Sequence, residues 1–351
     1  MAIQKASGVR PEQGDGVALN QAQLMDLVER ALLAGGCSAA VAAPIARTIA
    51  AAECDGTPSH GLLRLEGFLD AVKSGWADGK AQPRLISKSA SMLVVDACNG
   101  FTHLALDRYG KDMRAMARDT GVAILLVRNA HHFAALWPDI EAYASDGMIA
   151  LSCVNSRARM AAWGGGKPVF GTNACAFACP RGPGHPPVVW DQSTSVMSQG
   201  DVVLAAQEGR ALPGGVGVDA LGRATTDPRA ILDGGALAPY GGAKGASIAF
   251  MVEILAAALT GNEFSFEEAG RGSLPSKCGQ FLMVVDPSRA GTGFGGRVEA
   301  LVRAIADSGC DRMPGSRRYA RRARAGHEGI VISGRAYALL RELGVLEVES
   351  R

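Results

Sequence analysis

Several marks of secreted, membrane and metal-binding proteins are missing from the sequence. Its eight cysteines include no CxxC pair, and Cys175 and Cys179 lie in an apolar, strand-like run that is typical of packing. Residues 1–16 contain no apolar segment of the signal-peptide kind. No apolar run reaches the roughly 18 residues that a membrane span requires. We therefore expect a cytoplasmic protein with reduced thiols.

A strong charge of either sign is also missing. The 36 Lys and Arg residues nearly balance the 34 Asp and Glu residues, which leaves a net charge of +2. Such a chain offers no strong field to a nucleic acid or to an anionic membrane. The 45 glycines follow no fixed repeat, so they indicate many tight turns rather than low complexity. With 48% hydrophobic and 20% charged residues, the composition is that of a globular enzyme.

The apolar patterns predict a helical beginning and an alternation of strands and helices after it. Six short runs from about residue 90 onward have the length and composition of strands: SMLVVDA, GVAILLV, MIALSCV, ACAFACP, PVVWD and FLMVV. The tail after the last of them is helical and rich in arginine. Helical patterns lie at 19–34, 38–53 and about 60–74, and again near 102–119, 134–145, 198–209 and 244–260.

These patterns predict an α+β protein of two domains, since 351 residues exceed one small core. The central domain would hold the sheet and span about 86–290. The other domain would be mainly helical and combine residues 18–85 with residues 291–351. Residues 1–17 are expected to form a flexible arm.

The first candidate site is the SHGLLR stretch at residues 59–64. If a helix begins at Ser59, His60 and Arg64 lie one turn apart on the same face. A guanidinium binds a carboxylate through two parallel hydrogen bonds, and an imidazole titrates near neutrality and can donate a proton. The pair suits a small acid whose reacting carbon adjoins its carboxylate. The alternative is a capped structural helix with a surface arginine.

The second candidate site is the run RNAHHFAALWPDIE, which follows a predicted strand and leads into a predicted helix. Backbone N–H groups at the start of a helix can hold a phosphate or pyrophosphate. The adjacent histidines match no zinc spacing and successive residues point to different faces, so we expect no metal site. The alternative is a pair of buried histidines that pack the turn.

Short polar residues and two aspartates mark a third candidate site. Thr172, between Gly171 and Asn173, lies in a predicted tight turn beside a ligand. Asp191 ends a predicted strand, and Asp201 lies near the start of a predicted helix. An aspartate at a helix start is typical of a cap, whereas its functional alternative is a carboxylate that orients an imidazole.

Two further patterns need separate interpretations. Residues 291–296 satisfy GxGxxG, but five residues separate them from the preceding strand and an arginine-rich segment follows, so we do not expect a Rossmann site there. Residues 312–318 begin a run of arginines, extended by Arg321, Arg322 and Arg324. This run is either a solvated basic face or a clamp for phosphates, with arginine geometry suited to the 2′-phosphate of NADP.

Taken in order along the chain, the motifs resemble those of the malate/L-lactate dehydrogenase-like oxidoreductases, from about residue 20 to 345. The matching landmarks are SHGLLRLEGF, NAHHFAALWPDIE, VNS, GTN with AFA, VVWDQSTS, GDV, LDGGALAPYGGAKG and EGI. Within that family, HHFAALWPD and GD are similar to the Δ1-piperideine-2-carboxylate/Δ1-pyrroline-2-carboxylate reductase branch. The resemblance implies a non-Rossmann NAD(P)-binding central sheet domain and a homodimer with its site near the subunit interface.

The resemblance also implies a role for each matching residue. His60 would be the proton donor, with Ser59 and Asp201 completing a relay to it, while Arg64 and Thr172 would bind substrate. Four segments would hold NADP(H), and NAD(H) less well: His132, Phe133, Ala134, Ala135 and Leu136; Asp191, Gln192 and Ser193; Ala243 and Lys244; and Arg312, Met313, Pro314, Gly315, Ser316, Arg317 and Arg318.

At four positions the chain departs from the family pattern. Gln192 and Ser193 stand where a small apolar residue and alanine are usual, Ala243 replaces a frequent histidine, and Ala174 replaces proline. The contact at residue 243 is the one that these changes put in doubt. None of the changes removes a proposed catalytic group.

The implied reaction is hydride transfer to C2 of a cyclic imino acid, which would convert Δ1-piperideine-2-carboxylate to L-pipecolate and Δ1-pyrroline-2-carboxylate to L-proline. The first alternative is an NAD(P)-dependent 2-hydroxyacid dehydrogenase of the malate, lactate or ureidoglycolate type. More remote alternatives are a serine hydrolase using Ser59, His60 and Asp201, which lacks the GxSxG elbow, and a non-catalytic binding protein.

Overall fold

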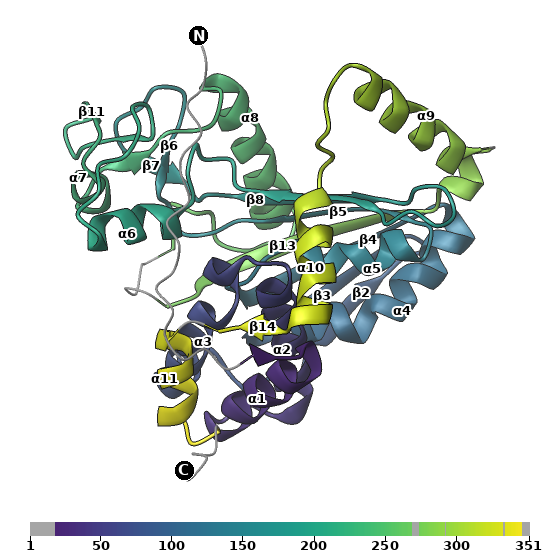
Figure 1. Ribbon diagram of the computed structural model, residues 1–351, viewed down its shortest axis with the longest axis horizontal. Helices are drawn as coiled ribbons and strands as arrows, with labels where there is room; N and C mark the ends of the chain where they lie inside the picture. Colours follow the sequence, from purple (N-terminus) through teal and green to yellow (C-terminus); the bar gives the residue numbers. More distant parts are fainter. Residues whose placement is uncertain (1–17, 269–273, 292, 333, 346–351) are drawn as a thin grey trace.

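The computed structural model describes residues 18–268, 274–291, 293–332 and 334–345. The predicted arm at residues 1–17 and the last residues of the predicted helical tail, 346–351, lie outside the described residues. The structure is a mixed α/β fold in which segments from both ends of the chain pack together beside a central sheet (Figure 1). No helix in the described ranges is long and apolar enough to span a bilayer.

The central element is a sheet that has seven strands within the described residues. All six runs predicted as strands lie in it, because each is apolar and of strand length. The edge strand β2 had no such pattern, since all five of its residues are exposed. β3 and β4 pair in parallel, whereas the other neighbours are antiparallel. The order is β2 (Arg84–Lys88), β3 (Met92–Phe101), β4 (Val122–His132), β13 (Ser276–Val285), β5 (Ile149–Val154), β8 (Ala174–Cys179) and β9 (Val188–Gln192).

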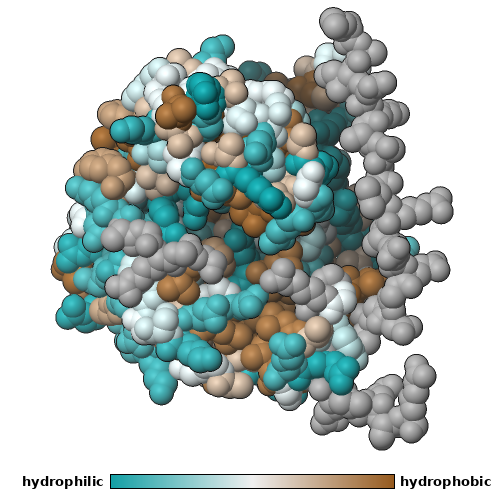
Figure 2. All heavy atoms as spheres, turned by 90° about the vertical axis from the view of Figure 1, so that its left-hand side faces the viewer, coloured by the Kyte–Doolittle hydropathy of each residue, from teal (hydrophilic) through white to brown (hydrophobic). Residues whose placement is uncertain are grey.

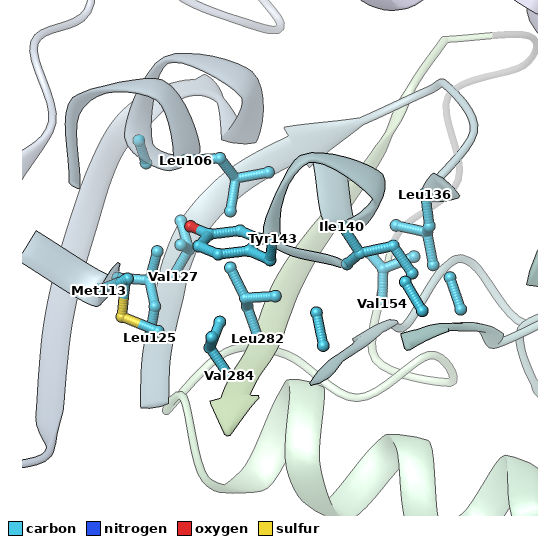
Figure 3. Close-up of a cluster of buried hydrophobic side chains, with 14 of the residues drawn as sticks. Leu106, Met113, Leu125, Val127, Leu136, Ile140, Tyr143, Val154, Leu282 and Val284 are labelled. Carbon is cyan, nitrogen blue, oxygen red and sulfur yellow. The ribbon is translucent and has the colours of Figure 1, made fainter. Parts of the chain in front are cut away.

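Helices cover both faces of this sheet. On one face α4 (Thr102–Thr120) and α5 (Trp137–Ser145) pack on a core in which Tyr143 and Ile140 lie against Leu282 and Val284 of β13 (Figure 3). On the other face Val252 and Ala256, from the end of α8 and the π-helical turn η3, pack on Cys153 and Cys175. The predicted helix at 244–260 is therefore two pieces, α8 (Ala243–Val252) and η3 (Glu253–Ala258).

A second core joins the beginning and the end of the chain. Helix α1 (Gln21–Ala34) begins with a capping box, in which Asn20 and Gln23 each accept a hydrogen bond from the other's backbone N–H at 2.9 Å. Its apolar face packs with α2 (Ala39–Cys54), α3 (Leu65–Lys73) and α11 (Gly334–Glu342). Strand β1 (Ala18–Leu19) pairs with β14 (Ile330–Val331). The boundaries of the two predicted domains stay predictions.

Short elements that the sequence patterns did not predict form a third core. Their strands are only two or three residues long and so show no periodicity. They pack with α6 (Gln199–Gln207), α7 (Pro228–Leu232) and α8. The strands are β6 (Met160–Ala161), β7 (Pro168–Phe170), β10 (Gly217–Val218), β11 (Ala224–Thr225) and β12 (Ala236–Leu237).

The last part of the chain forms helices that contact more than one of these cores. Helix α9 (Phe294–Asp307) follows the short turn η4 (Pro287–Ala290) and lies beyond one end of the central sheet (Figure 1). It is attached there by Glu299, which pairs with Arg181 at 2.8 Å. Helix α10 (Ser316–Glu328) then runs alongside α2 and α5. In Figure 2 the surface is hollowed between the half that carries α6 and α7 and the half that carries α3 and α11.

The predicted helix at 60–74 requires a correction. Two 3₁₀ turns, η1 (Pro58–His60) and η2 (Leu62–Arg64), precede α3. Gly61 separates them with φ −98° and ψ −130°, which is not a helical conformation. His60 and Arg64 are therefore not one turn apart on a single α-helix, and their relative placement depends on the turn at Gly61.

Candidate functional site

One edge of the central sheet carries the predicted site residues from the end of β4, from the GTN turn and from the end of β9. The carboxyl ends of β4, β5 and β9 meet the amino ends of β13 and β8 there, because these neighbouring strands are antiparallel. His132 lies opposite Ser276, and Val154 lies opposite Ala174. Thr172 and Asp191 fall along the same edge. The fold thus brings together motifs that are up to sixty residues apart.

His60 enters this region from the turn before α3. Its Nδ1 lies 3.1 Å from Oγ of Ser59. Poor solvation, then the positive charge of Arg64, then His132 lower the pKa of His60 to about 3, from an ordinary 6.5. His60 is therefore neutral at neutral pH in the free protein, with one ring nitrogen beside a hydroxyl.

Arg64 lies between an aromatic ring and the start of α6. Its guanidinium carbon is 4.4 Å from the ring centroid of Phe133, which is a cation–π contact. One terminal nitrogen lies 3.7 Å from the position that a Cβ on Gly200 would take. Burial lowers the pKa of Arg64 to about 10, against the attraction of Asp201, so the group stays charged at pH 7. Among the described residues its buried Nε has no hydrogen-bond partner. A carboxylate ligand would supply one.

Asp201 lies in the first turn of α6 and contributes to the helix start. Ser198 is the N-cap; its Oγ accepts from the Asp201 N–H at 3.1 Å and donates to Asp201 Oδ2 at 2.8 Å. Asp201 attracts the positive charge of Arg64. Within the described residues no hydrogen bond joins Asp201 to His60. The structure therefore brings Asp201 to the site through Arg64, while its predicted relay to His60 stays a prediction.

Asp191 acts as a cap for α5 from a different strand. Its Oδ2 accepts hydrogen bonds from the backbone N–H groups of Leu136 at 2.7 Å and Trp137 at 3.2 Å. Burial raises the pKa of this carboxyl, and the two N–H donors oppose that shift. These N–H groups, which the sequence pattern indicated as phosphate ligands, are thus already hydrogen-bonded to Asp191.

The two adjacent histidines point to different surroundings, as expected for neighbours on a strand. His131 lies against Trp76 and Phe101, with Nε2 3.1 Å from Oδ1 of Asn99. His132 stacks on His103, with ring centroids 5.3 Å apart and planes 9° apart. Its Nε2 lies 3.9 Å from Oδ2 of Asp139. Only His132 is thus close enough to His60 to affect its pKa.

The remaining residues of the 132–136 run divide between support and packing. Phe133 contacts Arg64, and Gly67 leaves room for its ring, because a Cβ there would lie 2.3 Å from Phe133 Cε1. Ala134 packs in the core that joins the chain ends. Ala135 and Leu136 are buried in the central core. Their side chains are therefore not available to a ligand.

The GTN turn is tied to helix α8 and the π-helical turn. The carbonyl of Thr172 accepts hydrogen bonds from N and Oγ1 of Thr194, at 2.8 and 3.0 Å. Asn173 is buried with φ +37°, and its Nδ2 donates to Oε1 of Glu253 at 2.7 Å. Ser193 Oγ lies 3.1 Å from Oγ of Ser195, whereas Gln192 is exposed. Hydrogen bonds to Thr194 and Glu253 thus hold the GTN turn in place.

Some side chains of the predicted phosphate clamp, residues 312–318, form hydrogen bonds within the protein. Arg318 donates to the carbonyl of Val189 at 2.6 Å and lies 4.8 Å from the ring centroid of Trp137. Ser316 Oγ donates to the carbonyl of Met313 at 2.8 Å, and Gly315 has φ +85°. The other side chains of the segment that can meet solvent are Arg312, Pro314 and Arg317, and those at the start of α8 are Ala243 and Lys244.

Several residues at the site carried no signal in the sequence. Glu53 accepts a hydrogen bond from the Leu62 N–H at 2.7 Å, and His103 is buried against His132. Buried Asp55 accepts from Trp137 Nε1 at 2.9 Å and from Arg322 at 2.7 Å. Glu53 and His103 lie in helices and Asp55 is a helix C-cap, and no sequence pattern distinguishes them before the fold shows what they contact. In the part of the chain that the structure describes, no His, Cys, Asp and Glu side chains converge as a metal site would require.

Comparison with known proteins gives one consistent result. A family model described as malate/L-lactate dehydrogenase matches residues 19–341. The Δ1-pyrroline-2-carboxylate/Δ1-piperideine-2-carboxylate reductase of Pseudomonas syringae pv. tomato is 48% identical over 325 residues, which are 92% of this chain and 94% of that protein. A (2R)-3-sulfolactate dehydrogenase (NADP+) of Chromohalobacter salexigens is 38% identical over 305 residues, 84% of this chain and 90% of that protein.

A solved structure agrees with this result. The crystal structure of Δ1-piperideine-2-carboxylate reductase from Pseudomonas syringae pv. tomato superimposes with a TM-score of 0.90 at 47% sequence identity. The match covers 93% of this chain and 99% of that chain. The described edge of the sheet and the SHG turn therefore belong to an architecture that is already known.

Proposed function

Because the chain belongs to the malate/L-lactate dehydrogenase family, we propose that it is an oxidoreductase that reduces cyclic 2-imino acids with NADPH. The substrates would be Δ1-piperideine-2-carboxylate, reduced to L-pipecolate, and Δ1-pyrroline-2-carboxylate, reduced to L-proline. The observation that carries this proposal is the placement of a charged Arg64 and a neutral His60 on consecutive turns beside one edge of the sheet.

Arg64 would bind the substrate carboxylate. Its guanidinium is charged, stacked on Phe133, and has a buried Nε without a hydrogen-bond partner among the described residues. A carboxylate would satisfy this nitrogen and pair with the charge through two hydrogen bonds. Thr172 would bind the same substrate from the opposite side of the edge. Fixing the carboxylate fixes the ring, which is the entropic part of catalysis.

His60 would give a proton to the ring nitrogen of the imine as C2 is reduced. Ser59 holds Nδ1 of the imidazole, so the other ring nitrogen is left for the substrate. A carboxylate bound to Arg64 offsets one of the charges that lower the pKa of His60. The proton donor would therefore take up a proton more readily when an acidic substrate binds, although burial still opposes its charge. Asp201 would complete the relay by restoring the proton.

The bound nicotinamide would supply the hydride to C2. The described residues fit such a group in charge, because Arg312, Arg317 and Lys244 are exposed cations. The GxGxxG at residues 291–296 begins helix α9 beyond the end of the sheet, so the site would be non-Rossmann. NADPH would bind better than NADH, as the NADP+-dependent relative also suggests for this scaffold.

A homodimer is proposed on the same basis, with a surface to support it. Phe250, Met251 and Ile254 are exposed on α8 and η3, and the Trp163 ring lies 6.1 Å from that of Phe250. Contiguous apolar side chains of this kind mark protein–protein contacts. Lys244 lies in the first turn of the same helix, so a subunit contact here would border the proposed cofactor site.

A substrate panel tests the proposed function. Initial rates of NADPH oxidation are measured with Δ1-piperideine-2-carboxylate, Δ1-pyrroline-2-carboxylate, pyruvate and oxaloacetate, and repeated with NADH. We expect the highest kcat/KM for the two imines with NADPH. The sulfolactate dehydrogenase among the relatives makes a 2-hydroxyacid dehydrogenase the second candidate. A higher kcat/KM for an oxo acid than for both imines would favour that function instead.

A further inference from the structure

Glu53 lies beneath the turn that carries His60 and Arg64. It belongs to the last turn of α2, and its Oε1 accepts a hydrogen bond from the backbone N–H of Leu62 at 2.7 Å. Leu62 is the first residue of η2, and the first N–H groups of a helical turn have no partner within the turn. The carboxylate thus satisfies a donor that the local structure leaves open.

The space at Gly61 is filled by the same carboxylate. A Cβ on Gly61 would lie 2.3 Å from Oε1 of Glu53 and 2.6 Å from its Cδ, closer than atoms can approach. The glycine therefore allows direct contact between the carboxylate and the peptide that joins η1 to η2. Because His60 ends η1 and Arg64 ends η2, this peptide sets the position of one relative to the other.

This placement of a carboxylate is costly. Burial raises the pKa of Glu53, and only the hydrogen bond from Leu62 opposes that shift. The carboxylate also lies at the carboxyl end of α2, where the helix dipole is unfavourable for a negative charge. A buried charge with one hydrogen bond costs free energy that an apolar residue would not. An apolar residue of similar size would fill the space but leave the Leu62 N–H without an acceptor.

We propose that Glu53 is a positioning residue, which holds the peptide between His60 and Arg64 and so sets the geometry between the proton donor and the carboxylate clamp. The proposal rests on the proposed function, since that geometry matters only for a substrate that uses both groups. Glu53 acts through Leu62 and Gly61 and makes no contact with the substrate.

The test compares two replacements of Glu53 in the full-length protein. Glu53→Gln keeps an oxygen that can accept from Leu62, whereas Glu53→Ala removes it. A displacement of about 1 Å at reacting groups can lower rates about 100-fold. We expect Glu53→Ala to lower kcat for Δ1-piperideine-2-carboxylate at least tenfold, with the Kd for NADPH changed less than twofold. Glu53→Gln should recover kcat to within about threefold of wild type.

Glu342→Ala is the matched control, because Glu342 is an exposed glutamate on α11. A merely structural role would lower the unfolding midpoint of Glu53→Ala and leave kcat unchanged in the folded fraction. That outcome overturns the proposal. Equal losses in Glu53→Ala and Glu53→Gln would also overturn it, because the negative charge and not the hydrogen bond would then be required.

Gly61→Ala provides a second route if Glu53→Ala does not fold. The added methyl group displaces the carboxylate from the other side of the contact. We expect Gly61→Ala to lower kcat at least tenfold, and an unchanged kcat contradicts the proposal. If wild type reduces neither imine, the proposed function fails; the same variants are then assayed with the acid that wild type does reduce, so the two failures are distinguishable.

Discussion

The pKa of the His60 imidazole depends first on burial and then on the charges around the ring. Arg64 and His132 both lower its pKa, after the larger effect of poor solvation. Arg64 is in turn attracted by Asp201, and it stacks on Phe133. A ligand that neutralises Arg64 therefore changes the protonation of His60. This coupling links recognition of the carboxylate to the supply of the proton.

Binding of a cyclic carboxylate should be accompanied by proton uptake. The pKa of His60 in the free protein is about 3, so the group is unprotonated at pH 6.5. A carboxylate on Arg64 raises that pKa toward its ordinary value, and a fraction of a proton is taken up. Calorimetric titration with pyridine-2-carboxylate, in the presence of NADPH and in buffers of different ionisation enthalpy, measures the number. The uptake is compared at pH 5.0, where a partial rise of this pKa is measurable, and equal uptake by wild type and His60→Ala would show that the two groups are not coupled.

One arginine of helix α10 binds the carboxylates of two other segments. Arg322 donates to both oxygens of buried Asp55, each at 2.7 Å, and to both oxygens of Glu141, each at 2.8 Å. Asp55 is the C-cap of α2 and Glu141 belongs to α5, so one side chain of α10 joins three helices. The same helix begins with the arginine-rich segment of the proposed cofactor site. Its position therefore matters for both stability and binding.

Arg322→Ala should destabilise the protein by about 3 kcal/mol, because it leaves the buried charge of Asp55 without its partner. The free energy of unfolding is measured in urea, with Arg324→Ala on the same helix as the control. Arg324 is exposed, and a surface substitution changes stability by about 0.5 kcal/mol at most. Equal midpoints for the two variants would mean that the network contributes little.

Some secondary-structure elements could be predicted from the sequence and others could not. The six strands of the central sheet could be predicted, because each is an apolar run bounded by turn residues. The turn at Gly61 could not, since the periodicity of Leu62, Leu65, Leu69 and Val72 begins directly after it and runs through η2 into α3 without a break. The break has a backbone conformation that no pattern encodes, and the Leu62 N–H beside it donates a hydrogen bond to Glu53, nine residues before Leu62.

At the scale of the whole molecule, the site is assembled from segments that meet only in the folded chain. The SHG turn, the end of β4, the GTN turn and the start of α6 were each singled out in the sequence. Which partner each side chain takes could not be read there. Asp191 caps α5, and Asp201 faces Arg64, because the sheet edge and α6 place them so. Such pairings between residues far apart in the sequence depend on tertiary packing, which the pattern of one segment does not predict.

Stability should depend on pH through the buried histidines. His103 is buried, and among the described residues neither ring nitrogen has a hydrogen-bond partner. Burial, then the charge of His132, lower its pKa to about 3. Below pH 6.5 His103 becomes protonated in the unfolded chain but stays neutral in the folded chain. The free energy of unfolding therefore falls as the pH drops from about 7 toward 3.

His103→Phe keeps the ring stacked on His132 and removes this titration. The loss of unfolding free energy between pH 7.5 and pH 5.0 should be smaller in the variant, by up to about 1.4 kcal/mol per pH unit below 6.5. Urea unfolding at the two pH values measures it. The carboxyl groups with raised pKa act in the opposite direction, but they are the same in both proteins. Identical losses would contradict the assignment.

We propose the SHG turn as the catalytic centre for the reduction of cyclic imino acids. Its most direct test is the turnover of Δ1-piperideine-2-carboxylate with NADPH by wild type and by His60→Ala, both at saturating cofactor. Removal of the acid should lower kcat by about 10²–10⁴-fold while the variant stays folded and binds NADPH. A folded His60→Ala protein with near-normal turnover would contradict the claim.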